Sequence, residues 1–147
     1  MPFWDETLPP EARGPAFGKW CASYFKHGDV SSNDFGELNQ RNPDESQKST
    51  IDQMTTEEIL SVADFVPGPK CETIWVSPVF VNVLANQTKV LFDPQVRKDW
   101  KGVTVWHIYG DMNSWIVLYA VQKFKQWAKP GEINFKVVER ANHFVSA

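Results

Sequence analysis

The sequence has no apolar run long enough to cross a membrane. Its apolar stretches, such as residues 79–81 and 116–120, are far shorter than the roughly 20 residues that a membrane-spanning helix needs. The first residues carry the acidic pair Asp5 and Glu6 where a secretory signal carries basic residues, and no apolar stretch follows. We therefore expect a cytoplasmic protein without a membrane span.

Cysteine and surplus positive charge are also scarce. The 147 residues include only Cys21 and Cys71, which form no Cys-x-x-Cys motif and no cluster with histidine. We expect two buried free thiols, no metal site and no other cofactor. The net charge of -3 and the scattered basic residues provide no cationic field for a phosphate backbone, which argues against nucleic acid as a partner.

Aromatic residues, in contrast, are abundant. Seven tryptophans and ten phenylalanines carry large apolar areas that must be buried in a core, a pocket or a partner. The prolines of residues 1–15 predict an extended arm, and the polar composition of residues 30–50 predicts a surface loop. Between them, apolar side chains at three- and four-residue steps predict a short helix that stops before Gly28: Phe17, Trp20, Cys21, Tyr24 and Phe25.

The middle of the chain has several helix signals. Residues 55–58 have the form of a capping box, which predicts a helix start and explains Glu57 and Glu58 without a glycosidase role. Residues 66–69 end that helix with prolines and glycine. Ser77 and Pro78 then predict a helix over residues 79–87 that packs on two faces, and Asp93-Pro94 begins a short helix that reaches Trp100.

The last third has the clearest pattern. Residues 103–109 and 133–138 are rich in β-branched and aromatic side chains, and the first run lacks polar alternation, which predicts a parallel strand covered on both faces. Residues 114–129 form an amphipathic pattern between them. Strand, crossover helix and strand make a right-handed parallel unit, whose functional residues follow the carboxyl ends of the strands.

Residues 105–111, the helix after them and residues 137–144 together resemble the last strand-helix-strand unit of α/β-hydrolases. In that family a strand ends in glycine before an acidic loop, and the next strand ends in a turn that carries the catalytic histidine. Residues 55–100 resemble the helical cap that members of this family, particularly fungal ones, insert before this strand. We therefore expect residues 1–102 to form a helical cap-like region that includes the irregular N-terminal arm, and residues 103–147 to form the C-terminal strand-helix-strand unit. The fold class that the resemblance implies is α/β, a partial α/β-hydrolase-like fold within one structural domain.

The resemblance implies His143 as the catalytic base and Asp111 as its acid partner. The commonest family acid position falls on Asn113, so the acid is either Asp111 or a residue on a strand that this chain lacks. The Gly-x-Ser-x-Gly turn that presents the serine nucleophile is absent. We therefore expect an esterase-like protein that is inactive alone, and whether it serves as an enzyme stays open.

Two kinds of partner follow from this reading. One is a small apolar, ester-like ligand, and the other is a second chain or a second copy that completes the sheet. The alternative function is a non-catalytic binding domain that uses its aromatic-rich surface. Among the remaining candidates, we expect His107 to be a core imidazole, His27 a cation at a helix end, and Ser114 a helix N-cap.

Overall fold

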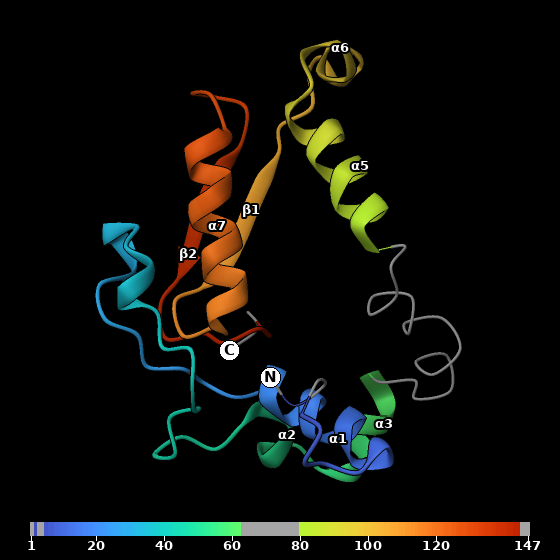
Figure 1. The fold of residues 1–147 in the computed structure, drawn as a ribbon, viewed down its shortest axis with the longest axis vertical. Helices are drawn as coiled ribbons and strands as arrows, with labels where there is room; N and C mark the ends of the chain where they lie inside the picture. Colours follow the sequence, from blue (N-terminus) through green and yellow to red (C-terminus); the bar gives the residue numbers. More distant parts are fainter. Residues whose placement is uncertain (1, 3–4, 63–79, 145–147) are drawn as a thin grey trace. The chain divides into compact units, whose positions relative to one another are not determined.

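The computed structural model describes residues 2, 5–62 and 80–144 (Figure 1). The chain divides into two compact units. We call Met1–Met54 with Val105–Ala147 the strand unit, and Thr55–Thr104 the helical unit. The first third of the chain thus belongs to the same unit as the C-terminal strands. Among residues 5–62 and 80–144, no helix is long and apolar enough to cross a membrane.

A parallel pair of strands forms the centre of the strand unit. Strands β1 (Trp106–Gly110) and β2 (Asn134–Val138) are joined by helix α7 (Trp115–Trp127), and Trp106 pairs with Asn134 at one end and Gly110 with Val138 at the other. The predicted strand-helix-strand unit is therefore confirmed. Elsewhere the described chain is mostly helical.

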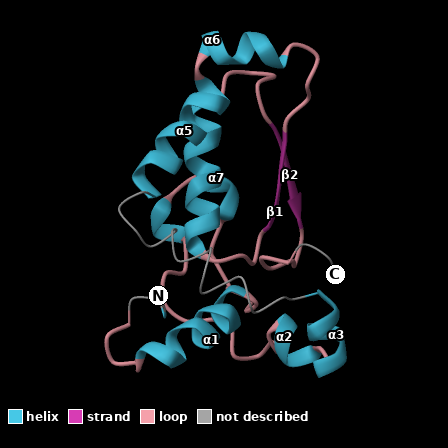
Figure 2. Cartoon of the chain, turned by 90° about the vertical axis from the view of Figure 1, so that its right-hand side faces the viewer, coloured by secondary structure: helices cyan, strands magenta, loops and turns pink. Residues whose placement is uncertain are grey.

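Helix α7 covers one face of this strand pair (Figure 2). Figure 2 shows α7 on one side of the strands, where Tyr109 packs with Leu118 and Val121 in the core. On the other side Trp106 is 57% exposed and Ile108 is 52% exposed. The prediction of a strand covered on both faces is wrong, because these two side chains of β1 are more than half exposed. We call the surface that includes Trp106 and Ile108 the open sheet face.

The N-terminal segment is more ordered than its prolines predicted. Helix α1 (Pro10–Cys21) begins with Pro10 in its first turn and contains Pro15 in its interior. Pro10 costs nothing there, because the first amides of a helix have no partner within it. The helix also ends earlier than expected, and Phe25 instead donates its amide to the carbonyl of Met112 at 2.9 Å.

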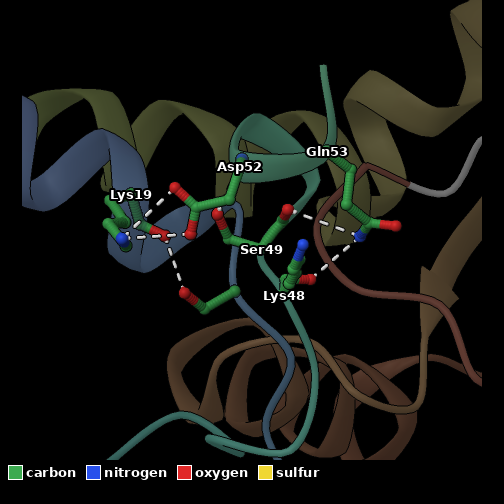
Figure 3. A network of polar contacts seen from close by, with 6 residues as sticks. Lys19, Lys48, Ser49, Asp52 and Gln53 are labelled. Carbon is green, nitrogen blue, oxygen red and sulfur yellow. Dashed lines mark hydrogen bonds and ion pairs between the residues drawn. The ribbon is translucent and has the colours of Figure 1, made fainter.

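The predicted loop is tied down at several points. It contains the short 3-10 turns η2 (Val30–Ser32) and η3 (Phe35–Glu37), and Leu38 is buried in the core. Helix α2 (Thr50–Gln53) follows, with the Ser49 hydroxyl accepting from the amide of Asp52 at 3.1 Å. Asp52 forms an ion pair with Lys19 of α1 at 3.0 Å (Figure 3). The loop is therefore polar but anchored.

The helical unit begins with the predicted capping box. Thr55 donates its amide to Glu58 Oε2 at 2.7 Å, and Glu58 donates its amide to Thr55 Oγ1 at 3.2 Å. The capping box is therefore confirmed, and Glu58 is a helix-start residue. The described part of the helical unit contains four elements: α3 (Thr56–Val62), α5 (Phe80–Phe92), α6 (Pro94–Arg97) and η5 (Lys98–Trp100).

Helix α5 differs from its prediction in length and in burial. It continues to Phe92 rather than ending at residue 87. Val81 is 68% exposed, so the prediction of a helix packed on two faces is wrong. The short helix predicted after Asp93 is present, with the Asp93 carboxylate accepting from the amide of Gln95 at 2.8 Å. The turn signals at residues 66–69 and 77–78 lie outside the described residues.

Candidate functional site

The carboxyl ends of β1 and β2 are locked together by backbone contacts. Asp111 donates its amide to the carbonyl of Val138 at 3.2 Å, and Met112 donates to the carbonyl of Ala141 at 2.9 Å. A Cβ atom at Gly110 would overlap the carbonyl group of Ala141. Gly110 is therefore required for the close approach of the two loops, and Asp111 and His143 do leave neighbouring strand ends.

The side chains of these two candidates are not joined. His143 is exposed, and its ring meets the ring of Phe144 edge-on at 5.7 Å. Within the described residues no hydrogen bond links His143 to Asp111, and Asp111 Oδ1 is buried without a hydrogen-bond partner. Asp111 and His143 thus follow neighbouring strands, but their side chains form no hydrogen-bonded pair. The roles of Asp111 and His143 stay predictions.

Asp111 instead lines a cavity of about 200 Å³ together with His27. The cavity is lined by residues from both ends of the strand unit: Phe25, Lys26, His27, Gly28, Val30, Asp111 and Met112. Burial lowers the pKa of the His27 imidazole, and the negative charge of Asp111 opposes part of that lowering. Asp111 therefore affects the pKa of His27, a residue that the sequence pattern did not mark as a site residue.

His27 is held as a neutral hydrogen-bonded ring. Its Nδ1 accepts from the amide of Asn39 at 2.8 Å, and its Nε2 lies 2.7 Å from the carbonyl of Asn113. Because Nδ1 accepts, Nε2 carries the proton and donates. Burial lowers the pKa of His27, against the opposing effects of the Asn113 carbonyl and the Asp111 charge.

The prediction that His27 is a cation at a helix end is therefore wrong. Helix α1 ends at Cys21, so the His27 ring does not face a helix C-terminus. Both ring nitrogens are occupied by backbone groups, which leaves neither free to take a proton from a substrate. We assign His27 the task of holding the loops around Asn39 and Asn113.

Asn113 and Ser114 have structural tasks at the start of α7. The buried Asn113 side chain accepts the amide of Ser114 at 2.8 Å. Ser114 occupies the N-cap position of α7, as predicted, but its hydroxyl makes no capping hydrogen bond. No imidazole is hydrogen-bonded to the Ser114 hydroxyl in the described part of the chain. Ser114 therefore lacks the base that a nucleophile needs.

The other candidates are accounted for by packing. His107 lies among the rings of Tyr109, Phe124 and Phe135, at centroid distances of 6.0, 5.5 and 6.0 Å, and burial lowers its pKa. This confirms the packing role expected of it. The thiol of Cys21 is partly buried and free, and burial raises its pKa to about 11, which makes it a poor nucleophile. Cys71 lies outside the described residues.

The aromatic residues of the N-terminal segment are also used in packing. Trp20 and Phe25 are buried and meet edge-on with ring centroids 5.2 Å apart, while Phe17 stacks on Trp20 at 6.0 Å. This packing buries Trp20 and Phe25, although Phe25 also lines the cavity beside His27. Across residues 5–62 and 80–144, no group of three metal-binding side chains gathers at one place.

Sequence reasoning missed Asn142, the residue before His143. Its side chain is completely buried and donates from Nδ2 to the Ala22 carbonyl and to Thr50 Oγ1, both at 2.7 Å. Its Oδ1 accepts the amide of Phe144 at 2.9 Å. These contacts fix the turn that carries His143. No local signal identifies Asn142, because its partners lie 120 and 92 residues away.

Comparison with known proteins adds no relative. No family model, no curated protein and no solved structure matches this chain. The function must therefore be argued from the geometry of the site.

Proposed function

We propose that this chain is a partial α/β-hydrolase-like protein, related to enzymes that cleave esters and similar acyl bonds, and that it has no turnover of its own. One observation carries the proposal: in a parallel strand-helix-strand unit, Asp111 directly follows the end of β1 and His143 lies in the turn after the end of β2. Functional groups of parallel α/β sheets lie beyond these carboxyl ends.

The chemistry of the resembled family explains why turnover is absent. In that mechanism a histidine takes the proton from a serine and returns it to the leaving group, while an acid orients the ring. His143 is the candidate for the first task and Asp111 for the second. The serine-bearing turn is missing from the sequence, and the two side chains form no hydrogen bond. The chain thus lacks both the serine nucleophile and the hydrogen bond between acid and histidine that the mechanism needs.

A second candidate function is favoured by the open sheet face. Parallel strands are normally covered on both faces, because their side chains are apolar on both sides. Trp106 and Ile108 are more than half exposed, which supports a non-catalytic interaction domain whose sheet is completed by a second chain or a second copy. Packing of Trp20 and Phe25 argues against the aromatic N-terminal segment as the binding surface in this alternative.

Labelling with a serine-directed fluorophosphonate tests the main proposal. The purified chain is incubated with the probe beside an active serine esterase as the positive control, and labelled peptides are mapped by mass spectrometry. We expect no labelled serine in this chain. Stoichiometric labelling of one serine, abolished when that serine is replaced by alanine, would show that the chain supplies its own nucleophile and would refute the proposal.

A further inference from the structure

A polar groove lies beside the carboxyl end of β2. It has a volume of about 530 Å³ and is open to solvent. Its lining comes entirely from the strand unit: Tyr24, Gln47, Lys48, Gln53, Glu139 and Arg140. Gln53 is held in place by hydrogen bonds from its Nε2 to the carbonyls of Lys48 and Ser49 (Figure 3). One wall of the groove is therefore built on an ordered turn.

Arg140 occupies a backbone conformation that arginine rarely adopts. Its φ is 59°, in the left-handed region where glycine and asparagine are favoured. The turn is imposed from both sides, because the Ala141 carbonyl accepts from Met112 and Asn142 is fully buried. The Arg140 side chain makes no hydrogen bond or ion pair with the described part of the chain. No hydrogen bond or ion pair within the described part of the chain therefore explains an arginine at this position.

The groups around Arg140 match a negatively charged ligand. Lys48 Nζ and the Tyr24 hydroxyl likewise form no hydrogen bond or ion pair with described residues. The charge of Lys48 helps to lower the pKa of Asp52, but the ion pair of Asp52 is with Lys19. With Glu139 in the same lining, Lys48 and Arg140 give the groove one net positive charge. A guanidinium and an ammonium beside a hydroxyl suit a singly charged oxyanion.

We propose that this groove binds a small oxyanion, a carboxylate or a phosphate, through Arg140 and Lys48. The guanidinium makes a forked contact with two ligand oxygens, and the Lys48 ammonium donates a further charge-assisted hydrogen bond to the anion. The left-handed backbone of Arg140 is then accounted for by its side chain, which serves the ligand rather than the turn. This site is independent of the hydrolase kinship and of the open sheet face.

The test is an NMR titration of the full chain with sodium phosphate, with sodium acetate, and with sodium chloride at matched ionic strength. We expect saturable shifts at the amides of residues 24, 48 and 140 with phosphate or acetate and none with chloride. The anion that produces them identifies the class of ligand. Saturable shifts with neither anion, or the same shifts with chloride, would overturn the proposal.

Variants separate a ligand role of Arg140 from a structural one. Arg140→Asn removes the charge but suits the left-handed backbone, so its melting temperature should equal or exceed that of the parent while anion affinity falls at least about tenfold. Lys48→Gln should also weaken binding, and Lys129→Gln, an exposed cation outside the groove, should not. An Arg140→Asn variant that binds like the parent, or that melts at a lower temperature, would overturn the proposal.

Discussion

Asn142 donates a 2.7 Å hydrogen bond to the hydroxyl of Thr50, a residue 92 positions earlier in the chain. The same Nδ2 group donates to the carbonyl of Ala22 at 2.7 Å. One fully buried side chain therefore joins the end of β2 to the segment after α1 and to the start of α2. Because Asn142 precedes His143, the N-terminal segment determines where the candidate catalytic turn lies.

Replacing Asn142 should destabilise the strand unit. Asn142→Ala removes three hydrogen bonds and leaves a small cavity, so we expect a loss of about 2–4 kcal/mol in the free energy of unfolding. Urea denaturation measures it. Gln126→Ala, at an exposed position of α7, is the control and should stay within about 0.5 kcal/mol of the parent. An equally small effect for Asn142→Ala would show that the buried contacts do not hold the turn.

Gly110 should be intolerant of any side chain. Gly110→Ala places a methyl group against the carbonyl of Ala141, so the loops at the strand ends must separate, and we expect a loss of at least about 2 kcal/mol. Gly18→Ala is the matched control, because nothing lies within 4 Å of a Cβ at that helical position. It should stabilise α1 by about 0.5–1 kcal/mol. The two variants should therefore shift the urea midpoint in opposite directions, and a shared direction would contradict the close approach.

Stability should fall in mild acid because of two histidines. Burial lowers the folded-state pKa of both His27 and His107 below the ordinary value of 6.5. The unfolded chain then takes up protons that the folded chain refuses, so stability is full above about pH 6.5 and declines as the pH falls toward the lowered values.

His107→Phe tests one half of this effect. Phenylalanine fits among the surrounding rings and does not titrate, so the decline in melting temperature below pH 6.5 should become shallower. Thermal unfolding recorded at a series of pH values measures it. An unchanged slope in the variant would mean that His107 takes no part in the pH dependence.

The open sheet face should mediate association rather than stability. Replacing both Trp106 and Ile108 by threonine removes exposed apolar area, so the free energy of unfolding should change little, by about 0.5 kcal/mol for each residue. Sedimentation velocity at increasing concentrations should show association of the parent that the double variant loses. A parent chain that stays monomeric throughout would exclude a second copy as the partner that completes the sheet.

Local patterns predicted the C-terminal strand-helix-strand unit well. A β-branched run that ends at Gly110, an amphipathic segment and a second run define β1, α7 and β2, and their parallel pairing follows from the crossover helix. The capping box at Thr55 and Glu58 was equally predictable from the sequence, because both partners lie within one helical turn.

Contacts between distant segments were not predictable in this way. His27 meets the Asn113 carbonyl across 86 positions, and Asn142 meets Ala22 across 120. No periodicity in one sequence links such pairs. The prediction of an extended arm was wrong where α1 begins, because proline in a first helical turn, as at Pro10, looks the same in sequence as proline in an extended arm.

The proposed hydrolase-like strand unit should show no hydrolase turnover. The most direct measurement is sustained hydrolysis of p-nitrophenyl acetate, followed past one equivalent of product so that acylation of surface side chains is not counted. We expect the parent chain to hydrolyse the ester at the same rate as the His143→Ala and Asp111→Ala variants. A saturable rate in the parent that both substitutions abolish would contradict it.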